Sequence, residues 1–366
     1  MRILHITFHL LQGGIERFAV GLCNSLAADP QNEIHLLTIV DDKIPGNSYF
    51  LEKLDENVTY HNLGQKNALK PKNMIAVYKA IKEIDPDIVH MHCNNIPAYL
   101  PSLFNRKPTY IYTQHGIADK AISFEWLQPI QRWFFKKRLI HPVTISETCR
   151  KTYRKFYNLD NDLCITNGID PALPTPRGEE VRKEIEEYRN SPDTPVFLHV
   201  ARCSEEKNQK LLFDTFNRLH ESGKKFLLVV IGAKYEDSEY IKLNDTGYIK
   251  ILGTRENIGD YLACADFFVL TSLWEGLPLS VLEAMSAGCI TISTPAGGVP
   301  DIIKDGVNGF LSPDFTTDGL HKTVIRALEN SGSIDKKAIR EQFLQNHTME
   351  KCAEEYAKLY NRLHDR

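Results

Sequence analysis

Two glutamates, Glu275 and Glu283, stand eight positions apart with Gly276 and Pro278 between them. The first follows the apolar run Phe267–Leu270, which predicts a strand, and open parallel sheets bind ligands beyond the carboxyl ends of their strands. The glycine lets a ligand approach the backbone closely, and the proline suits the first turn of a helix. Free N–H groups at such a helix start favour a phosphate.

Glu283 would lie about one turn further into this helix, where its carboxylate can accept hydrogen bonds from two vicinal hydroxyls. The competing interpretation is that Glu275 and Glu283 are solvated carboxylates on an ordinary helix, because most glutamates are exposed. The combination of strand end, glycine, proline and paired glutamates favours a binding site.

A basic pair, Arg202 and Lys207, flanks the loop that follows the expected strand Val196–Val200. Two cations beside a helix start can bind a pyrophosphate without a metal ion. Ion pairs with Glu205 or Glu206 on the surface are an equally good interpretation of the pair taken alone.

The first expected strand, Ile3–Phe8, leads into Gly13 and Gly14. The spacing is not G-x-G-x-x-G, so it does not indicate a dinucleotide site. A double glycine suits a tight turn whose N–H groups meet an anion, or simply a strand-to-helix turn.

His115 follows the expected strand Thr109–Gln114. A single histidine is more often structural than catalytic, and further histidines lie at strand ends of the same half of the chain, namely His5, His9, His90 and His92. Position alone leaves its role open.

These side chains require a frame of alternating strands and helices. Besides the strands above we expect strands at Ile34–Val40, Val58–Leu63, Asp87–Met91, Val143–Ser146, Phe226–Ile231, Ile249–Leu252 and Ile290–Ser293. Helices are expected at Ile15–Ala27, Asn73–Ile84, from Glu147, and at Glu179–Arg189, Gln209–His220, Ile258–Ala263, Leu279–Ala287, Gly319–Asn330 and Met349–Leu363. This alternation predicts an α/β protein with parallel, doubly wound sheets.

The length of 366 residues favours two domains, since single cores tend to split beyond roughly 250–300 residues. The proline-rich stretch Asn167–Arg177 is the expected linker. We predict domains at 1–170 and 171–348, with the last helix, 349–366, packing back on the first domain.

Composition limits the class of protein. The formal net charge of −3 gives no field of the kind that binds nucleic acid. Eight cysteines without C-x-x-C pairs predict a reduced cytosolic chain. We expect no signal peptide at the polar N-terminus and no membrane span, because no run of about 18 apolar residues occurs.

The stretch from Ser272 to Met285 resembles the E-x7-E motif of the family 4 retaining glycosyltransferases. The resemblance extends over essentially the whole chain. It implies the GT-B fold, in which two Rossmann-like doubly wound domains face a central cleft.

The resemblance also implies roles for single residues. Glu275 faces donor-sugar hydroxyls, Glu283 holds the ribose, the loop of Arg255 meets the nucleobase, and Glu16 binds an acceptor hydroxyl. The implied catalytic residues are His115, Glu275, Arg202 and Lys207. The implied donor-binding residues are Gly13, Gly14, Arg202, Lys207, Arg255, Glu275, Gly276, Leu277, Leu279 and Glu283.

By the same resemblance, the chain transfers a hexose or N-acetylhexosamine from a UDP-sugar to a glycan or lipid-linked acceptor, as in surface polysaccharide or glycolipid synthesis. The family's reaction is a front-face substitution with retention, in which His115 positions the sugar; a general-base role is the less favoured variant. No cofactor or metal is expected, and the acidic pairs Asp41-Asp42 and Asp85-Pro86-Asp87 match no metal motif.

The stretch Trp126–Arg138 is rich in aromatic and basic residues, and four more basic residues follow on the next expected helix, Arg150, Lys151, Arg154 and Lys155. A basic amphipathic helix with tryptophans fits an anionic membrane surface, although a core-packing aromatic helix is an equal alternative. We therefore expect a cytoplasmic protein that can bind the inner face of the membrane. A sugar-nucleotide epimerase and an inactive sugar-nucleotide-binding relative are the competing functions.

Overall fold

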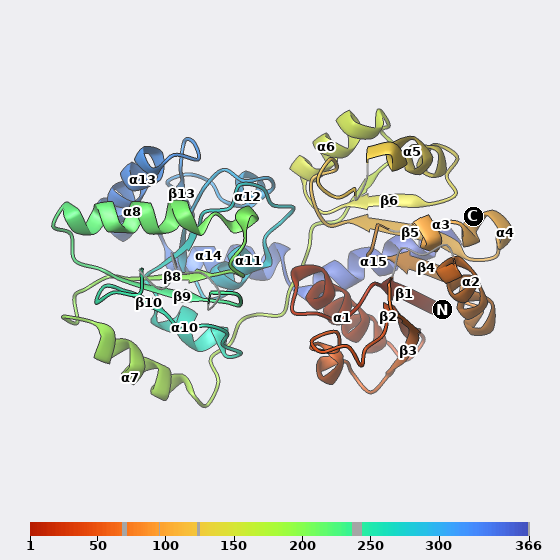
Figure 1. Ribbon diagram of the computed structural model, residues 1–366, viewed down its shortest axis with the longest axis horizontal. Coiled ribbons are helices and arrows are strands. Elements are labelled where there is room, and N and C mark those ends of the chain that lie inside the picture. The colour runs from red at the N-terminus through yellow and green to blue at the C-terminus, as the bar shows by residue number, and fades with distance from the viewer. Residues whose placement is uncertain (68–71, 95, 123–124, 236–243, 365–366) are drawn as a thin grey trace. The chain divides into compact units, whose positions relative to one another are not determined.

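The computed structural model describes the chain except for residues 68–71, 95, 123–124, 236–243 and 365–366. The chain forms two compact units, the first made of residues 1–170 and 347–366 and the second of residues 171–346. Each unit is a parallel sheet with helices on both faces (Figure 1). The predicted fold class, an α/β protein of Rossmann-like doubly wound domains, is confirmed.

The first unit has a seven-stranded sheet in the order β3-β2-β1-β4-β5-β6-β7. Its strands are β1 (Arg2–Thr7), β2 (Glu33–Val40), β3 (Val58–Gln65), β4 (Ile88–Met91), β5 (Thr109–Gln114), β6 (His141–Thr144) and β7 (Leu163–Cys164). Its helices are α1 (Gly14–Ala27), α2 (Lys72–Ile84), α3 (Ile96–Tyr99), α4 (Pro101–Phe104), α5 (Gln128–Lys136), α6 (Glu147–Tyr157) and α15 (Met349–His364).

The second unit has a six-stranded sheet in the order β10-β9-β8-β11-β12-β13. Its strands are β8 (Val196–Val200), β9 (Leu227–Ile231), β10 (Ile249–Ile251), β11 (Phe267–Leu270), β12 (Ile290–Ser293) and β13 (Gly309–Leu311). Its helices are α7 (Gly178–Tyr188), α8 (Gln209–Glu221), α10 (Ile258–Cys264), α11 (Leu279–Ser286), α12 (Val299–Ile302), α13 (Thr317–Asn330) and α14 (Lys336–Asn346).

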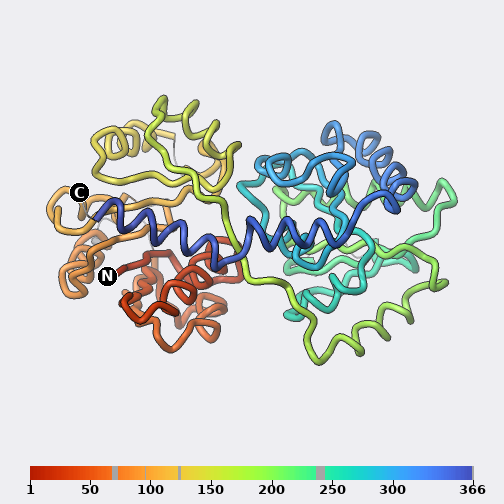
Figure 2. Tube along the Cα trace, turned by 180° about the vertical axis from the view of Figure 1, so that it is seen from behind, coloured from red at the N-terminus to blue at the C-terminus, as the bar shows by residue number. Residues whose placement is uncertain are grey.

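The last helix, α15, belongs to the first unit, where it lies along the layer of α1 (Figure 2). The two helices come so close at Gly21 that a Cβ there would lie 2.8 Å from Cε of Met349. On the sheet side, Tyr356 and Tyr360 of α15 are buried and hydrogen-bond to Thr113 and His90. The helix therefore completes the core of the first unit.

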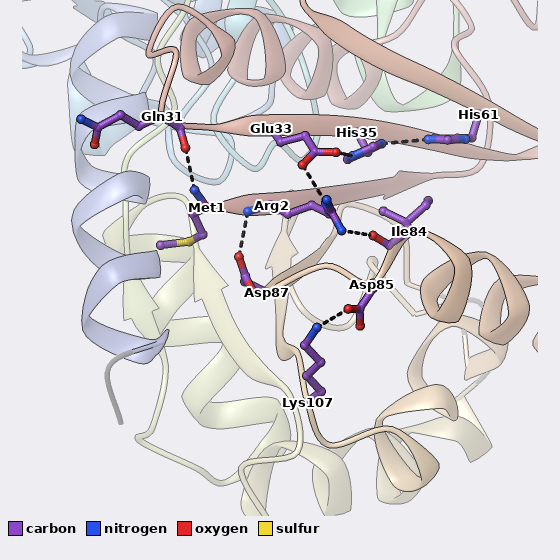
Figure 3. A network of polar contacts seen from close by, with 10 residues as sticks. All are labelled: Met1, Arg2, Gln31, Glu33, His35, His61, Ile84, Asp85, Asp87 and Lys107. Atoms are coloured by element: carbon purple, nitrogen blue, oxygen red, sulfur yellow. Dashed lines mark hydrogen bonds and ion pairs between the residues drawn. The ribbon is translucent and has the colours of Figure 1, made fainter.

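A polar network lies along the amino ends of the strands of the first sheet (Figure 3). The backbone N–H of Arg2 donates to Asp87 at 2.8 Å, and its guanidinium donates to Glu33 at 2.8 Å and to the carbonyl of Ile84 at 2.9 Å. Glu33 also meets His35, which hydrogen-bonds to His61. These groups satisfy one another at the edge opposite the expected ligand edge, so their role is structural.

One expected strand is shifted. We predicted a strand at Val143–Ser146, whereas β6 covers His141–Thr144. Ser146 instead begins α6 as its N-cap, and its hydroxyl accepts from the N–H of Cys149 at 3.1 Å. A serine at a helix start satisfies an otherwise unpaired N–H, and this ends the strand early.

Candidate functional site

Glu275 lies in the turn after β11 and is 6% exposed. Its Oε1 accepts from Nζ of Lys207 at 2.7 Å and from the hydroxyl of Ser272 at 2.6 Å. The hydrogen bonds leave the second carboxylate oxygen, Oε2, as the further acceptor of this side chain.

The same turn is fixed from behind by Gly297, which the sequence did not single out. Its φ is +50°, and a Cβ there would lie 1.7 Å from the carbonyl oxygen of Glu275. The N–H of the next residue, Gly298, donates to the carbonyl of Gly276 at 3.0 Å. Only glycine fits at position 297, and its sequence signal is the pair Gly297-Gly298 directly after β12 and its short turn.

Lys207 bridges two carboxylates, because its Nζ also lies 3.0 Å from Oε1 of Glu206. Burial by itself lowers the pKa of this lysine, but the charges of Glu275 and Glu206 outweigh burial and leave the pKa raised. The side chain is therefore a firmly charged ammonium inside the domain. The surface ion pair weighed from the sequence is present as the contact with Glu206, and the pair with Glu275 is additional.

Arg202 differs from Lys207. Its side chain is exposed, and no carboxylate of the described residues pairs with its guanidinium. Its backbone is fixed, because its carbonyl accepts from the side chain of Gln209 at 3.1 Å and the neighbouring carbonyl of Ala201 accepts from Tyr235 at 3.1 Å. The guanidinium is thus free to meet an anion from a rigid loop.

The helix α11 begins at Leu279, after Pro278. The proline is the N-cap and not, as we predicted, part of the first turn, and it makes no side-chain capping hydrogen bond. An uncapped helix start keeps N–H groups available for an anion. Of the predicted contact residues, Leu277 and Glu283 are buried, whereas Gly276 and Leu279 are partly exposed.

Arg255 follows β10, and its guanidinium bonds within the domain. It donates to Tyr261 at 3.1 Å and to the carbonyl of Leu252 at 2.5 Å, and it lies 3.9 Å from Glu184. The carbonyl of Gly253 accepts from the N–H of Gly232 at 2.9 Å. These bonds hold the loops after β9 and β10 together.

In the first unit, Gly13 is the N-cap of α1 and Gly14 its first residue. A Cβ at Gly13 would lie 2.4 Å from Oε2 of Glu16, so the glycine makes room for this carboxylate to fold back over the helix start. Oε1 of Glu16 lies 3.0 Å from Nδ1 of His9.

His115 follows β5 and is partly exposed. Its Nε2 lies 3.1 Å from Nδ1 of His92, and its ring packs edge-on against Phe18. Burial lowers the pKa of His115 to about 3, so the imidazole is neutral near pH 7. A base with this pKa is weak, which disfavours the general-base variant. The contact with His92 is the feature that the sequence missed.

The exposed face of α5 carries Ile130 and Trp133, which are 38% and 45% exposed, and Trp126, in the short 3-10 turn Glu125–Leu127 just before the helix, is 67% exposed. Its other face buries Gln131, Phe134 and Phe135. The buried face fits the core-packing interpretation, and membrane binding by the exposed face stays a prediction. Farther along, Arg150 and Arg154 pair with Asp162. No helix in the described part of the chain is long and apolar enough to cross a membrane.

Two family models match the chain. Residues 12–173 match the model described as Glycosyltransferase Family 4, and residues 180–346 match the model described as Glycosyl transferases group 1.

Among curated proteins, the chain is 24% identical to an Escherichia coli UDP-Gal:alpha-D-GlcNAc-diphosphoundecaprenol alpha-1,3-galactosyltransferase, over 98% of this chain and 96% of that protein. It is also 24% identical to the N-acetyl-alpha-D-glucosaminyl L-malate synthase of Bacillus anthracis, over 91% and 90%.

Among solved structures, a glycosyltransferase from Rickettsia africae aligns with a TM-score of 0.82 at 19% identity, covering 99% of this chain and 98% of that one. Anabaena HepE, solved with UDP and glucose, aligns with a TM-score of 0.80 at 18% identity, covering 99% and 100%. At these identities the structures bear on the fold alone.

Proposed function

Glycosyltransferase models match both halves of the chain, which therefore belongs to the glycosyltransferases of the GT-B fold. We propose that it transfers a hexose or N-acetylhexosamine from a UDP-sugar, with retention of the anomeric configuration. The observation that carries the proposal is the cluster of Lys207, Glu275 and Ser272 beside the uncapped start of α11.

In this proposal the diphosphate binds the exposed guanidinium of Arg202, the ammonium of Lys207 and the N–H groups at the start of α11. All three stabilise the negative charge that grows on the leaving UDP, and no metal ion takes part.

Glu275 accepts hydrogen bonds from the donor sugar through its remaining lone pairs, and Glu283 accepts from the ribose. Leu277 and Leu279, with Gly276, shape the surface against which the sugar lies. The loop of Arg255 meets the nucleobase through its backbone, because the guanidinium already bonds to Tyr261 and Leu252.

The reaction breaks the bond between the anomeric carbon and the phosphate oxygen while the acceptor hydroxyl attacks from the same face. The leaving phosphate oxygen takes the hydroxyl proton, so configuration is retained and no protein nucleophile is needed. His115 contacts the transferred sugar, and its low basicity supports a positioning role. Glu16 binds the acceptor.

The names of relatives support the choice of substrates. The Escherichia coli relative is named for UDP-galactose and a lipid diphosphate acceptor. We propose a UDP-sugar donor and a glycan or lipid-linked acceptor for this chain, in surface polysaccharide or glycolipid synthesis in the cytoplasm.

The test of this function begins with thermal shifts for UDP, GDP, UDP-galactose, UDP-glucose and UDP-N-acetylglucosamine. A bound donor raises stability by RT ln(1 + [L]/Kd). The stabilising sugar nucleotide is then assayed for UDP release with and without glycan or lipid-linked acceptors and with EDTA. Proton NMR of the product should give the anomeric configuration of the donor. Inversion of the anomeric configuration would reject the retaining mechanism, and a loss of activity in EDTA would reject the metal-independent site. Epimerisation without an acceptor would reject the transferase function.

We propose that the exposed face of α5 and the short turn before it bind the membrane surface. Trp126, Ile130 and Trp133 precede the exposed cations Lys136 and Lys137, an arrangement suited to the interface of an anionic bilayer. We expect flotation with phosphatidylglycerol vesicles at low salt and its loss in the Trp126→Ser, Trp133→Ser double variant. The matched control is Phe104→Ser, which removes another aromatic, 69% exposed, outside this helix. Equal flotation of all three proteins, or none at all, would reject the membrane role.

A further inference from the structure

Three imidazoles form a continuous row of hydrogen bonds that ends at His115. Nδ1 of His5, in β1, lies 2.9 Å from Nε2 of His92, which follows β4. Nδ1 of His92 lies 3.1 Å from Nε2 of His115, which follows β5. The row thus crosses three neighbouring strands, from a fully buried side chain to one at the carboxyl edge of the sheet.

All three rings are neutral near pH 7. Burial lowers the pKa of His5 and of His115 to about 3, and burial with the neighbouring histidines lowers that of His92 well below its ordinary value. A neutral imidazole has one N–H donor and one acceptor nitrogen. Because His92 uses both of its nitrogens in the row, every N–H must point the same way, and only two arrangements exist.

In the first arrangement the protons point toward the edge of the sheet. Nδ1–H of His5 donates to His92, and Nδ1–H of His92 donates to Nε2 of His115. His115 then carries its own proton on Nδ1, the nitrogen that the row leaves unused. In the second arrangement the directions reverse, and His115 presents a bare Nδ1.

The two arrangements differ at the buried end. The reverse arrangement puts a proton on Nε2 of His5, which is buried and has no hydrogen-bond partner among the described residues. Its neighbour His90 cannot accept it, since both nitrogens of that ring bond to Tyr360 and Thr113, at 2.6 and 2.7 Å. Unpaired buried N–H groups are rare in proteins because they lose water without replacement. The first arrangement places only a bare acceptor there.

We propose that His5 and His92 are positioning residues that hold His115 as its Nδ1–H tautomer. The nitrogen of His115 that faces away from His92 is then a hydrogen-bond donor to an oxygen of the transferred sugar and cannot take a proton. The identity of that partner rests on the proposed function, whereas the tautomer rests on the row itself.

A metal ion is the other use to which these side chains could be put. Ligand nitrogens of His5, His90 and His92 lie within 4.8 Å of one another. However, five of these six ring nitrogens already take part in hydrogen bonds, and a metal ligand must offer a bare lone pair. Binding an ion would break the row, so the hydrogen-bonded row is the assignment that we test.

The direct test reads the proton positions by NMR. The full chain is labelled with ¹⁵N-histidine, and the His115 signals are assigned by their disappearance in His115→Asn. We expect Nδ1 protonated and Nε2 bare at pH 7.5, and a mixture of tautomers in His92→Leu. A proton on Nε2 of His115 in the unchanged protein would overturn the proposal, as would a metal-type shift of His5 or His92 that EDTA abolishes.

The activity test compares two replacements of His115. Asparagine places an amide N–H near the position of Nδ1, and glutamine places one near Nε2. With UDP-galactose and UDP-N-acetylglucosamine as donors, we expect UDP release within about 10-fold of the unchanged protein for His115→Asn and a loss of about 100-fold or more for His115→Gln. The opposite order would refute the donor role.

A second pair of variants tests the positioning role. His92→Asn keeps an N–H near Nδ1 and should retain the Nδ1–H form of His115 and most activity, whereas His92→Leu should lose both. If both variants kept the tautomer, His92 would have no positioning role. If the unchanged protein turned over neither donor, the proposed function would fail, while the NMR result would still decide the tautomer.

Discussion

At Glu275 one carboxylate oxygen accepts from both Lys207 and Ser272. The positive charge of Lys207 is therefore balanced by Glu275 before any ligand arrives, and with Glu206 the three side chains carry a net negative charge. The exposed Arg202 is the cation that is not already paired, so the two cations of the expected phosphate site are not equivalent. The sequence predicted the pair but could not separate them, because the difference comes from a contact between the loops after β8 and β11.

Neutralising Glu275 tests its assignment directly. Glu275→Gln keeps the size and one oxygen of the side chain but removes the charge that faces Lys207 and the proposed sugar. We expect kcat/KM for UDP release with acceptor to fall by about 100-fold.

Glu206→Gln is the matched control for this variant, because Glu206 also lies against Lys207, at 3.0 Å, and is more exposed than Glu275. It should lose less than about 10-fold. Full activity in Glu275→Gln would contradict its place in the donor site.

Gly297 sets a steric limit on the same turn. Gly297→Ala adds a Cβ 1.7 Å from the Glu275 carbonyl at a φ of +50°, and we expect a loss of about 3 kcal/mol in the free energy of unfolding, with weaker UDP binding.

Gly306 has a φ of +73° but nothing within 4 Å of an added Cβ. Gly306→Ala should therefore cost only about 1 kcal/mol, from backbone strain alone. Urea unfolding measures both variants, and equal losses would show that the close approach at Gly297 is unimportant.

Most of the elements that carry the site were predictable. The strands at 109–114, 196–200, 267–270 and 290–293 were predicted with the observed bounds, since apolar runs between turn residues give a strong signal. The short elements β7, β13, α3, α4 and α12, and the helix α14, were not predicted. Segments of two to four residues have too few positions for a period, and α14 has a weak apolar pattern.

The partners of His115 escaped prediction for a different reason. The sequence placed His5, His90 and His92 at strand ends, but which of them touch depends on the strand order β1-β4-β5 and on the register. Tertiary pairing of this kind leaves no local pattern. The roles assigned to all the predicted site residues, Glu16, Arg255 and Glu283 among them, remain predictions.

The attachment of α15 to the first sheet gives a prediction for an element. Tyr360→Phe removes the hydroxyl that bonds to Nδ1 of the buried His90 at 2.6 Å. Leaving that nitrogen unpaired should cost about 1–3 kcal/mol. The transition of the first unit in calorimetry should shift while that of the second unit stays.

Lys358→Ala is the control on the same helix, because Lys358 forms an ion pair with Glu355 at an exposed position. It should change stability by less than about 0.5 kcal/mol. A Tyr360→Phe variant as stable as this control would mean that the hydroxyl contributes nothing to the attachment of α15.

Over the whole molecule, the histidines whose pKa is lowered by burial are unevenly divided. His5, His90, His92, His115 and His347 belong to the first unit, and the pKa of each is lowered chiefly by burial. In the second unit, burial lowers the pKa of His199 to about 4 and also lowers that of His321. This difference makes the two units respond differently to acid.

The direction in which pH changes the stability follows from the difference in proton binding between the unfolded and folded states. Above the unfolded pKa of about 6.5 both states are neutral and the stability is fully present. Below this pKa the histidines bind protons in the unfolded chain but stay neutral in the folded one. Each histidine then lowers the free energy of unfolding by up to about 1.4 kcal/mol per pH unit. The loss continues until the pH reaches the pKa in the folded state, which is about 3 for His5.

We therefore expect the first unit to lose more stability than the second between pH 7 and 5.5, a window above the range of the carboxylates. Calorimetry at these pH values, with Tyr360→Phe marking the transition of the first unit, measures the difference. Little change is expected between pH 8 and 7. Equal shifts of both transitions below pH 7 would contradict the prediction.

The return of α15 to the first unit also has a consequence for synthesis on the ribosome. Residues 171–346 follow one another without interruption, so the second unit has its complete sequence before α15 is translated. The first unit has all its strands early but lacks Tyr356 and Tyr360 until residues 171–346 have been translated. During that delay the surface that α15 will cover, on α1 and on the first sheet, stays exposed to water. This surface is the part of the nascent chain that would need a chaperone for the longest time.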